Sequence, residues 1–382
     1  MKKIIVLGAG LIGKEAAKDL SSRHEVTAAD RVGDALVRAF SGVDVRTIQV
    51  DLTDPGAVRR VVEPFDLVVG ALPGFLGRGA LEEVIRAGKD VVDIAFFPED
   101  PLELDNLALE SGVTAIVDFG LAPGMSNCLL GFHAAGMKRV DRFECLVGGL
   151  PRDRECPFEY KAVFSPRDVI EEYTRPARLV EKGEVVVRPA LSEVERVRFE
   201  GVGELEAFNT DGLRTLLHTM RVPEMREKTL RYPGHASHMR SMREAGFFST
   251  EPIELSGASV TPLDFTTRLL FPAWKLGPGE EDLTVMRVTV QGIGEHGKAE
   301  TVVYDLLDRY DTEGGVTSMA RTTGYACAAA VELLARGLFA RKGVCPPEIV
   351  GAQAGCLDFI LSHLHERGVV YRKTVTRDKP DS

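Results

Sequence analysis

The chain has 382 residues, of which 44% are hydrophobic and 27% charged, a composition typical of soluble globular proteins and a length sufficient for two domains. Its formal net charge is −10, and lysines and arginines are scattered among acidic residues, which argues against a nucleic-acid partner. No apolar run reaches the roughly 18 residues that a membrane-spanning helix needs, so no membrane partner is expected.

The cysteines and the N-terminus indicate the compartment that we expect. The cysteines show neither a CxxC pair nor the spacing of a metal site, so we expect reduced thiols and no bound metal. The first residues, MKKIIVLGAG, are charged and then apolar, but glycines end the apolar run too early for a signal peptide. The sequence therefore predicts a cytoplasmic protein. The cysteines are Cys128, Cys145, Cys156, Cys327, Cys345 and Cys356.

The first part of the chain alternates between short apolar runs and helical patterns. Residues 11–22 and 78–88 have the apolar spacing of helices. Strands that alternate with helices predict a doubly wound parallel α/β sheet, and we assign residues 1–125 to this domain. The six predicted strands cover residues 3–8, 24–30, 43–51, 65–72, 90–95 and 113–118.

The pattern changes near residue 142, where longer strand candidates begin that lack regular helical crossovers. They predict a second, α+β domain with an antiparallel or mixed sheet, which we place at residues 126–339. An alanine-rich helix is expected over 314–339 and an amphipathic helix over 356–368. Residues 340–382 are too few to fold alone, so we expect them to return to the first domain. The strand candidates cover residues 142–150, 183–189, 204–210, 282–292 and 298–311.

A glycine-rich motif follows the first predicted strand and opens the first predicted helix. In GAGLIG, Gly8 permits a tight turn, Gly10 lets the backbone approach a pyrophosphate, and Gly13 lets helix and strand pack closely. The helix N-terminus attracts the phosphates. This context indicates a Rossmann dinucleotide-binding site. The residues expected to bind the cofactor here are Gly8, Ala9, Gly10, Leu11, Ile12 and Gly13.

The end of the second predicted strand bears on the choice of cofactor. Asp30 can accept hydrogen bonds from the adenosine ribose and repel a 2′-phosphate, which favours NAD over NADP. Arg31 is an argument in the other direction, because an arginine there can hold a 2′-phosphate. We expect NAD as the cofactor.

The ends of the next strands face the same cleft, because ligands of open parallel sheets bind outside the carboxyl ends of the strands. Asp93 ends the fifth predicted strand and Asp118 ends the sixth. Either one alone can be the cap of a following turn, but two acids at neighbouring strand ends favour a functional role. Further cofactor contacts are expected after strands three and four, at Asp51, Leu52, Ala71, Leu72, Pro73 and Gly74.

The segment TLRYPGHASHM, from Thr229 to Met239, gathers an arginine, a tyrosine and two histidines around a Pro-Gly turn. It can be a surface turn, with Arg231 in a surface salt bridge and His238 solvated or in the core. Alternatively, the second domain supplies these groups to chemistry at the dinucleotide site. Arg231 suits a substrate carboxylate because a guanidinium forms two parallel charge-assisted hydrogen bonds.

Five separated motifs resemble the saccharopine dehydrogenase-like family, and the resemblance covers nearly the whole chain. The motifs are GAGLIG, GALPG, DFGLAPGMSN, LRYPGH and SMARTTGY, which begin at residues 8, 70, 118, 230 and 318. The middle segment, residues 148–191, is most similar to the NAD-dependent L-lysine 6-dehydrogenases. The resemblance implies a catalytic cleft between the two domains and a homodimer formed through the second. It also implies that Arg231 holds the carboxylate of an amino acid substrate.

Oxidation of a primary amine by NAD needs a neutral nitrogen, because a protonated nitrogen has no lone pair to expel the hydride. The ε-amine of free lysine has a pKa near ~10.4, so the site must remove this proton. We expect His235 as the base and Asp93 and Asp118 as a proton relay. The product would be 2-aminoadipate 6-semialdehyde, which can cyclise, and ammonia. The expected substrate-binding residues are Arg231, Tyr232, Asp211, Asn209, Thr322 and Thr323.

Three other functions remain open from the sequence. A saccharopine-type reductase must seat an adduct with three carboxylates and therefore needs several cationic groups in the cleft. A carboxynorspermidine-type reductase would use NADPH, which Asp30 disfavours. A non-catalytic dinucleotide sensor would need no polar cleft in the second domain. The cations available to clamp a saccharopine-like adduct besides Arg231 are Lys161, Arg175, Arg178 and Arg214.

Overall fold

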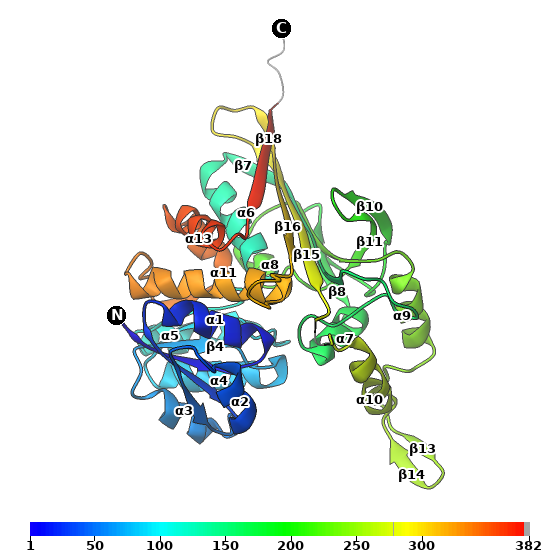
Figure 1. Cartoon of the computed structure of the whole chain (residues 1–382). Coiled ribbons are helices and arrows are strands. Elements are labelled where there is room, and N and C mark those ends of the chain that lie inside the picture. The colour runs from blue at the N-terminus through cyan, green and yellow to red at the C-terminus, as the bar shows by residue number, and fades with distance from the viewer. Residues whose placement is uncertain (278, 378–382) are drawn as a thin grey trace.

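The computed structural model describes residues 1–277 and 279–377, which form two sheets with helices between and around them (Figure 1). The prediction that residues 340–382 return to the first domain includes residues 378–382, which lie outside the described part of the chain.

The first sheet is parallel and seven-stranded, with the order β17-β6-β5-β4-β1-β2-β3. The prediction of a doubly wound parallel sheet is confirmed. The reversal of strand order lies beside β1, which is where such folds open a ligand crevice. The strands are β1 (Lys3–Leu7), β2 (Glu25–Asp30), β3 (Val45–Gln49), β4 (Leu67–Gly70), β5 (Asp90–Asp93), β6 (Thr114–Ile116) and β17 (Gly343–Cys345).

Both faces of this sheet are buried, as the continuous apolar runs of its strands require. Ile4 and Val6 of β1 belong to one apolar cluster, together with residues of α1 and α2, while Ile5 and Leu7 belong to another with residues of α3 and α4. The helices of this domain are α1 (Leu11–Ser21), α2 (Gly33–Ala39), α3 (Pro55–Val62), α4 (Gly74–Arg86), the 3₁₀ turn η1 (Pro101–Leu104) and α5 (Asp105–Glu110).

The second sheet is mixed. Strand β12 pairs with β7 in parallel, and the other pairs of the sheet are antiparallel. The path runs β10-β11-β12-β7-β15-β16-β18, and β8 pairs with β12 and β9. The strands are β7 (Arg139–Pro151), β8 (Ala177–Glu181), β9 (Glu184–Arg188), β10 (Glu195–Phe199), β11 (Gly203–Asn209), β12 (Glu224–Arg231), β15 (Asp282–Ile293), β16 (Ala299–Arg309) and β18 (Tyr371–Arg377).

The remaining helices connect the sheets or extend from them. Helix α10 and a two-stranded hairpin form an arm that projects from the second domain (lower right in Figure 1). The helices are α6 (Met125–Gly136), α7 (Pro166–Thr174), α8 (Leu216–Thr219), α9 (His235–Glu244), α10 (Pro262–Trp274), α11 (Ser318–Ala335), α12 (Pro347–Ala352) and α13 (Cys356–His365), and the hairpin strands are β13 (Ile253–Leu255) and β14 (Ala258–Val260).

The C-terminal part of the chain joins both domains. We expected all of residues 340–382 to return to the first domain. Strand β17 pairs with β6 of the first sheet, whereas β18 pairs with β16 of the second. This correction has a simple reason: β16 would otherwise be an unpaired edge strand, and the alternating residues of β18 supply its missing backbone hydrogen bonds.

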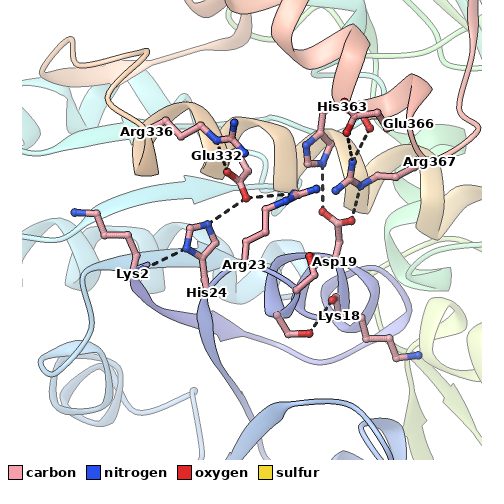
Figure 2. Close-up of polar contacts among 12 residues, drawn as sticks. Lys2, Lys18, Asp19, Arg23, His24, Glu332, Arg336, His363, Glu366 and Arg367 are labelled. Carbon is pink, nitrogen blue, oxygen red and sulfur yellow. Dashed lines mark hydrogen bonds and ion pairs between the residues drawn. The ribbon is translucent and has the colours of Figure 1, made fainter.

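A polar seam joins α1 to α11 and α13 (Figure 2). We use the term seam for Asp19, Arg23, His24, Glu332, Arg336, His363 and Arg367. Glu332 of α11 is 3.1 Å from His24 Nε2, 3.3 Å from Arg23 Nη1 and 2.8 Å from Arg336 Nε. Asp19 of α1 lies 3.2 Å from His363 and pairs with Arg367. The carboxylates of the seam thus bind cationic or hydrogen-bonding groups of more than one element.

Across the described ranges, no helix is long and apolar enough to cross a membrane. Within the same ranges, no group of three or more His, Cys, Asp or Glu side chains could hold a metal ion. The six cysteines are free thiols, and all but the exposed Cys156 are buried.

Candidate functional site

A cavity of about 760 Å³ lies between the two domains. One part of its wall comes from the turn between β1 and α1 and from the segments that follow β2, β3, β4 and β6. The other part comes from β7, α7, β12 and the loop after β11, and α11 completes the wall. The cavity therefore joins the carboxyl ends of the parallel strands to the second domain, and we call it the cleft.

Most of the residues expected to bind a dinucleotide lie in one part of the cleft wall. Two do not line it: Ala9 donates its N–H to Asp30 Oδ2 at 2.9 Å, and Gly74 is packed so closely that a Cβ would lie 2.3 Å from the carbonyl oxygen of Phe96. Those that line the cleft are Gly8, Gly10, Leu11, Ile12, Gly13, Asp30, Arg31, Asp51, Leu52, Ala71, Leu72 and Pro73.

Each of the three glycines of GAGLIG is required, or free of contacts, for a different structural reason. Gly8 has φ +95°, and a Cβ there would lie 2.5 Å from the carbonyl oxygen of Ala71. A Cβ at Gly13 would lie 2.1 Å from the carbonyl oxygen of Gly8, so this position sets the close packing of α1 on β1. A Cβ at Gly10 would meet no atom within 4 Å. Gly10 therefore leaves open space at the cleft wall, where a ligand can approach the backbone.

The start of α1 fits a pyrophosphate. Gly10 is the N-cap and supplies no side-chain hydrogen bond, and the first turn carries no acidic residue. The unpaired backbone N–H groups and the positive end of the helix dipole therefore face the cleft without a competing carboxylate. The residues present fit a pyridine dinucleotide, which supplies a hydride acceptor when it is bound.

The adenosine end of this site is marked by two carboxylates. Asp30 is oriented by the N–H of Ala9, and Asp51 Oδ1 accepts hydrogen bonds from the hydroxyl and the N–H of Thr53 at 2.7 and 3.0 Å. These hydrogen bonds lower the pKa of Asp51. Arg31 also lines the cleft. The geometry thus brings together the residue that favours NAD and the one that could hold a 2′-phosphate.

Asp118 is held by an arginine that the sequence had suggested as a substrate clamp. Arg214 Nε and Nη2 donate to the two Asp118 oxygens, each at 3.0 Å, and Nη1 donates to the carbonyl oxygen of Phe97 at 2.6 Å. Both side chains are almost fully buried, and Asp118 has φ +53°, which is uncommon for a residue other than glycine. The pair fixes the second domain to the carboxyl ends of β5 and β6.

The carboxylate of Asp211 is likewise bound by an arginine. Arg178 donates through Nε and Nη2 to its two oxygens at 2.9 and 2.8 Å, and its backbone N–H donates at 3.2 Å. Asp211 lines the cleft, but its charge is compensated. The expected role of Asp211 as the partner of a substrate ammonium therefore competes with a bidentate ion pair.

Arg231 lies in the cleft wall and is only 2% exposed. Its Nη2 donates to Glu172 Oε2 at 2.5 Å, Nη1 donates to the carbonyl oxygen of Leu230 at 2.9 Å, and the guanidinium stacks on the Tyr160 ring. Its buried Nε has no hydrogen-bond partner in the described part of the protein. The guanidinium is thus oriented by the fold and is not fully satisfied by it.

His235 does not line the cleft, and this corrects the expectation that it lies there as the base. It is 2% exposed, with Nε2 at 2.9 Å from the Tyr173 hydroxyl and Nδ1 at 3.0 Å from the Phe158 carbonyl oxygen. Burial, followed by the charge of Arg231, lowers the pKa of His235 to about 3. Both nitrogens therefore serve a buried hydrogen-bond network behind the wall.

The rest of the LRYPGH motif is also structural. The Tyr232 hydroxyl donates to the Pro151 carbonyl oxygen at 2.9 Å, and Tyr232 does not line the cleft. Glu206 accepts hydrogen bonds from the N–H groups of Gly234 and Ala236, at 3.0 and 2.5 Å, and so stabilises the start of α9. Arg231 alone of this motif faces the cleft.

Four other predicted residues divide between the wall and the interior. Thr323 lines the cleft, whereas Asn209, Thr322 and Asp93 do not. Asn209 donates to the Ser192 hydroxyl at 3.1 Å, and the Thr322 hydroxyl donates to the Ser318 carbonyl oxygen at 2.9 Å. Asp93 is buried, and burial raises its pKa well above the usual range. Asp93 therefore lies behind the cleft wall and has no direct access to a proton of a substrate in the cleft.

The sequence analysis missed four carboxylates of the wall: Asp168, Glu171, Glu172 and Glu227. Burial raises the pKa of Asp168, Glu172 and Glu227, that of Glu227 to about 8. The signal for Glu227 was present, because EKTLR places Glu227, Thr229 and Arg231 on one face of a strand. The three on helix α7, Asp168, Glu171 and Glu172, could not be found this way, since nothing local says which face of α7 meets the other domain.

Comparisons with known proteins agree with this architecture. A family model described as the saccharopine dehydrogenase NADP binding domain matches residues 4–116, and one described as the saccharopine dehydrogenase C-terminal domain matches residues 120–369. A solved structure of the apo, histidine-tagged, L-Glu-forming saccharopine dehydrogenase of Saccharomyces cerevisiae has a TM-score of 0.79 and 21% identity, and the match covers 98% of this chain and all of that one.

The chain is also similar in sequence to two proteins whose names state an enzymatic activity. The chain is 24% identical to the NADP⁺-dependent, L-glutamate-forming saccharopine dehydrogenase of Pyricularia oryzae, over 91% of this chain and 93% of the relative. It is 23% identical to the mitochondrial alpha-aminoadipic semialdehyde synthase of Rattus norvegicus, over 98% of this chain and 48% of that protein.

Proposed function

The chain belongs to the saccharopine dehydrogenase family of oxidoreductases, and we propose that it oxidises the ε-amine of L-lysine with NAD. The products would be 2-aminoadipate 6-semialdehyde, which cyclises, and ammonium. The family alone does not select this substrate, since two of the similar proteins named above are saccharopine dehydrogenases by name. The proposal depends on the charge of the cleft.

The observation that carries the proposal is the acidic balance of the substrate part of the cleft. A substrate with three carboxylates would meet repulsion from this wall, whereas a substrate with an added ammonium group is attracted to it. Asp118 and Asp211 are each bound by an arginine through two hydrogen bonds and do not count in this balance. The remaining acidic residues of that part are Asp168, Glu171, Glu172 and Glu227, and the basic ones that line it are Arg175 and Arg231.

The cations that a saccharopine-like adduct would need are already paired. Arg214 binds Asp118 and Arg178 binds Asp211, both through two hydrogen bonds. The other two are also paired: Arg175 with Glu171 at 3.3 Å, and Lys161 with Glu280 at 3.1 Å and with Glu155 at 3.8 Å. Freeing a buried arginine would leave its carboxylate partner unpaired, which typically costs several kcal/mol. These pairs support a substrate with one carboxylate.

Arg231 and Glu172 suit the α-amino acid end of lysine. The guanidinium can hold the carboxylate, and the Glu172 carboxylate, 2.5 Å from Arg231 Nη2, can accept from the α-ammonium. The pair would then bind both charges of the zwitterion side by side. This replaces the role that we expected for Asp211.

The proposal of NAD depends on Asp30, at the end of β2. The relative from Pyricularia oryzae named above is NADP⁺-dependent by name, and Arg31 beside Asp30 keeps that cofactor chemically possible. The carboxylate of Asp30, held toward the site by Ala9, would repel a 2′-phosphate. Replacing Asp30 by alanine is expected to reduce the preference for NAD, since Arg31 then faces the phosphate alone.

The test is a screen of amine oxidation. The purified protein is mixed with lysine, saccharopine or cadaverine and with NAD or NADP, the reduced dinucleotide is followed by absorbance, and products are identified by mass. Turnover of lysine with NAD supports the proposal, and Arg231→Ala should then raise the KM for lysine far more than for cadaverine, which has no carboxylate. Preferred turnover of saccharopine, or of NADP, would contradict it.

A further inference from the structure

Strand β12 carries three polar residues along the cleft. Glu227, Thr229 and Arg231 alternate with Lys228 and Leu230, and the three line the cleft while the other two do not. Glu227 and Arg231 are four residues apart, which corresponds to about 13 Å along an extended strand. A substrate whose carboxylate is bound by Arg231 would extend along β12 toward the carboxylate of Glu227.

Glu227 is a buried carboxylate without a compensating partner. It is 5% exposed, and within residues 1–277 and 279–377 its side chain is seen in no hydrogen bond or ion pair; only burial and the charges of more distant groups act on its pKa. Its Oε1 occupies the space beside Gly212, where a Cβ would lie 1.6 Å away. A side chain at position 212 would displace the carboxyl group, so the glycine in the loop after β11 leaves room for it at the cleft wall.

The charged groups around Glu227 come from helix α7 and from the loop after β11. Glu172 of α7 and Asp211 of the loop after β11 oppose its ionisation, and Arg214 favours it. Arg214 is bound to Asp118, so its charge is largely compensated. Burial is the main cause that raises the pKa of Glu227, to about 8. A cation that entered the cleft would favour the ionised carboxylate and would lower this pKa.

We infer that Glu227 accepts the proton of the substrate's ε-ammonium group and is thereby a catalytic residue of the oxidation. The inference rests on the proposed function. Other acids of the cleft are less suited, because Asp118 and Asp211 are held by arginines and Glu172 by Arg231. Glu171 pairs with Arg175, and Asp168 has hydrogen bonds with Ser165 and with the backbone of Gly74. Of the groups that we expected to transfer protons, His235 and Asp93 do not reach the wall.

The proton and electron balance is as follows. The ε-ammonium gives one proton to the Glu227 carboxylate and becomes a neutral amine. The ε-carbon then loses a hydride to the bound oxidised dinucleotide, and the nitrogen lone pair forms the C=N bond of an iminium ion. Water adds to the iminium carbon, and the C–N bond breaks to give the aldehyde and ammonium. Glu227 returns its proton to solvent, so one proton is released in each turnover.

The first experiment compares Glu227→Gln with the wild-type protein. Glutamine keeps the shape but cannot accept the proton, so kcat for lysine should fall by about 10²–10⁴-fold. The acid limb of kcat/KM should lie near pH 8 in the wild type, and it should move toward the ~10.4 of free lysine in the variant, which must capture the neutral amine. Glu227→Asp should recover part of the loss and keep the lower limb.

The matched control is Glu204→Gln on β11, which removes a carboxylate that is 64% exposed and paired with Arg196 on the surface. It should leave kcat and its pH profile unchanged. Binding of NADH, followed by its fluorescence, should be the same in the wild-type protein and in the Glu227 and Glu204 variants if their folds are intact. If Glu227→Gln retains wild-type kcat and the limb near pH 8, Glu227 is not the acceptor, and the proposed function stands without it.

A second measurement needs no turnover. Lysine is titrated calorimetrically into the wild-type protein with NADH at pH 7, in buffers of different ionisation enthalpy. Binding should release close to one proton, because the ammonium favours the ionised form of Glu227. The release should vanish in Glu227→Gln, and at pH 9.5 in the wild type. Lysine binding without proton release overturns the inference. Failure of lysine both to bind and to be oxidised overturns the proposed function and the inference together.

Discussion

Two regions of the molecule bury carboxylates to a similar extent and treat them in opposite ways. Glu332 in the seam is 1% exposed, and Glu227 in the cleft is 5% exposed. Burial alone would raise the pKa of Glu332, but Arg336, His24 and Arg23 lower it below the usual range. Burial raises the pKa of Glu227, and its acidic neighbours raise it further. The sign of the shift is therefore decided by the neighbours and not by burial.

The same contrast holds for the two aspartates Asp19 and Asp93. Burial would raise the pKa of Asp19, but His363 and Arg367 of the seam lower it. Burial raises the pKa of Asp93 well above the usual range, and the charge of Asp118 adds to this. Paired carboxylates stabilise the contact of α1 with α11 and α13, while unpaired ones lie at or behind the cleft, where a cationic ligand can compensate them.

The largest effect is expected when a cleft carboxylate that an arginine compensates loses this partner. Arg214→Met would leave Asp118 buried without its two hydrogen bonds and close to Asp93. We expect a loss of about 3–5 kcal/mol in the free energy of unfolding, measured with urea. Arg196→Met, at an exposed pair with Glu204, is the control and should cost less than about 1 kcal/mol. Equal losses would contradict the distinction.

A smaller effect of opposite sign is expected for Glu227→Gln. The folded-state pKa of Glu227, about 8, lies above its ordinary value of 4.5. Its contribution to stability is complete below pH 4.5 and is lost as the pH rises through 8. Glutamine cannot ionise, so the variant should gain stability relative to the wild type between pH 6 and 9. The gain at pH 9 should be on the order of a few kcal/mol, since one pKa unit corresponds to about 1.4 kcal/mol. A gain that is independent of pH would contradict the assignment.

Glu332→Gln should have a still smaller effect and the reverse pH dependence. The folded-state pKa of Glu332 is lowered, so its contribution to stability is present above the ordinary value of 4.5 and is lost as the pH falls through the folded-state value. We expect a loss of roughly 2 kcal/mol at pH 7, because Arg23 and Arg336 are 33% and 49% exposed and remain partly solvated. The loss should shrink at pH 3, and kcat per folded molecule should not change.

The control for Glu332→Gln lies in the same seam region (Figure 2). Glu366 is 63% exposed and 3.7 Å from Arg367, so Glu366→Gln should change the free energy of unfolding by less than about 0.5 kcal/mol. An equal loss in the two variants would mean that the burial of Glu332 is not what makes its pairing valuable.

The first domain could be predicted because its signals are local. Six of its seven strands lie in short runs rich in apolar or β-branched residues, and the glycines of GAGLIG stand directly between a strand and a helix. Strand β17 escaped prediction because Gly343–Cys345 is only three residues long and becomes a strand by pairing with β6. The partner of β18 was equally hidden, since an exposed strand of alternating residues does not specify which edge it joins.

The sequence predicted where the cleft lies, but it did not predict several of the side chains that line it. The motif LRYPGH suggested chemistry at His235, yet burial against Tyr173 and Phe158 makes this histidine part of the structure. Glu227 lies four residues before Arg231 and shares its strand face, a period-two pattern that sequence can reveal once the strand is recognised. What sequence could not reveal is the pairing of Arg214 with Asp118, which joins residues 96 positions apart across the two domains.

The smallest expected effect tests whether the seam compensates Glu332 redundantly. His24 Nδ1 accepts the N–H of Lys2 at 3.2 Å, so in the neutral ring Nε2 carries the proton and donates to Glu332 at 3.1 Å. A glutamine amide can replace this donor, and Arg23 and Arg336 remain, so His24→Gln should cost less than about 1 kcal/mol by urea unfolding at pH 7. A loss as large as that of Glu332→Gln would instead make His24 the decisive partner. Redundant pairing is what Glu227 lacks, because the cation that would compensate it arrives only with the substrate.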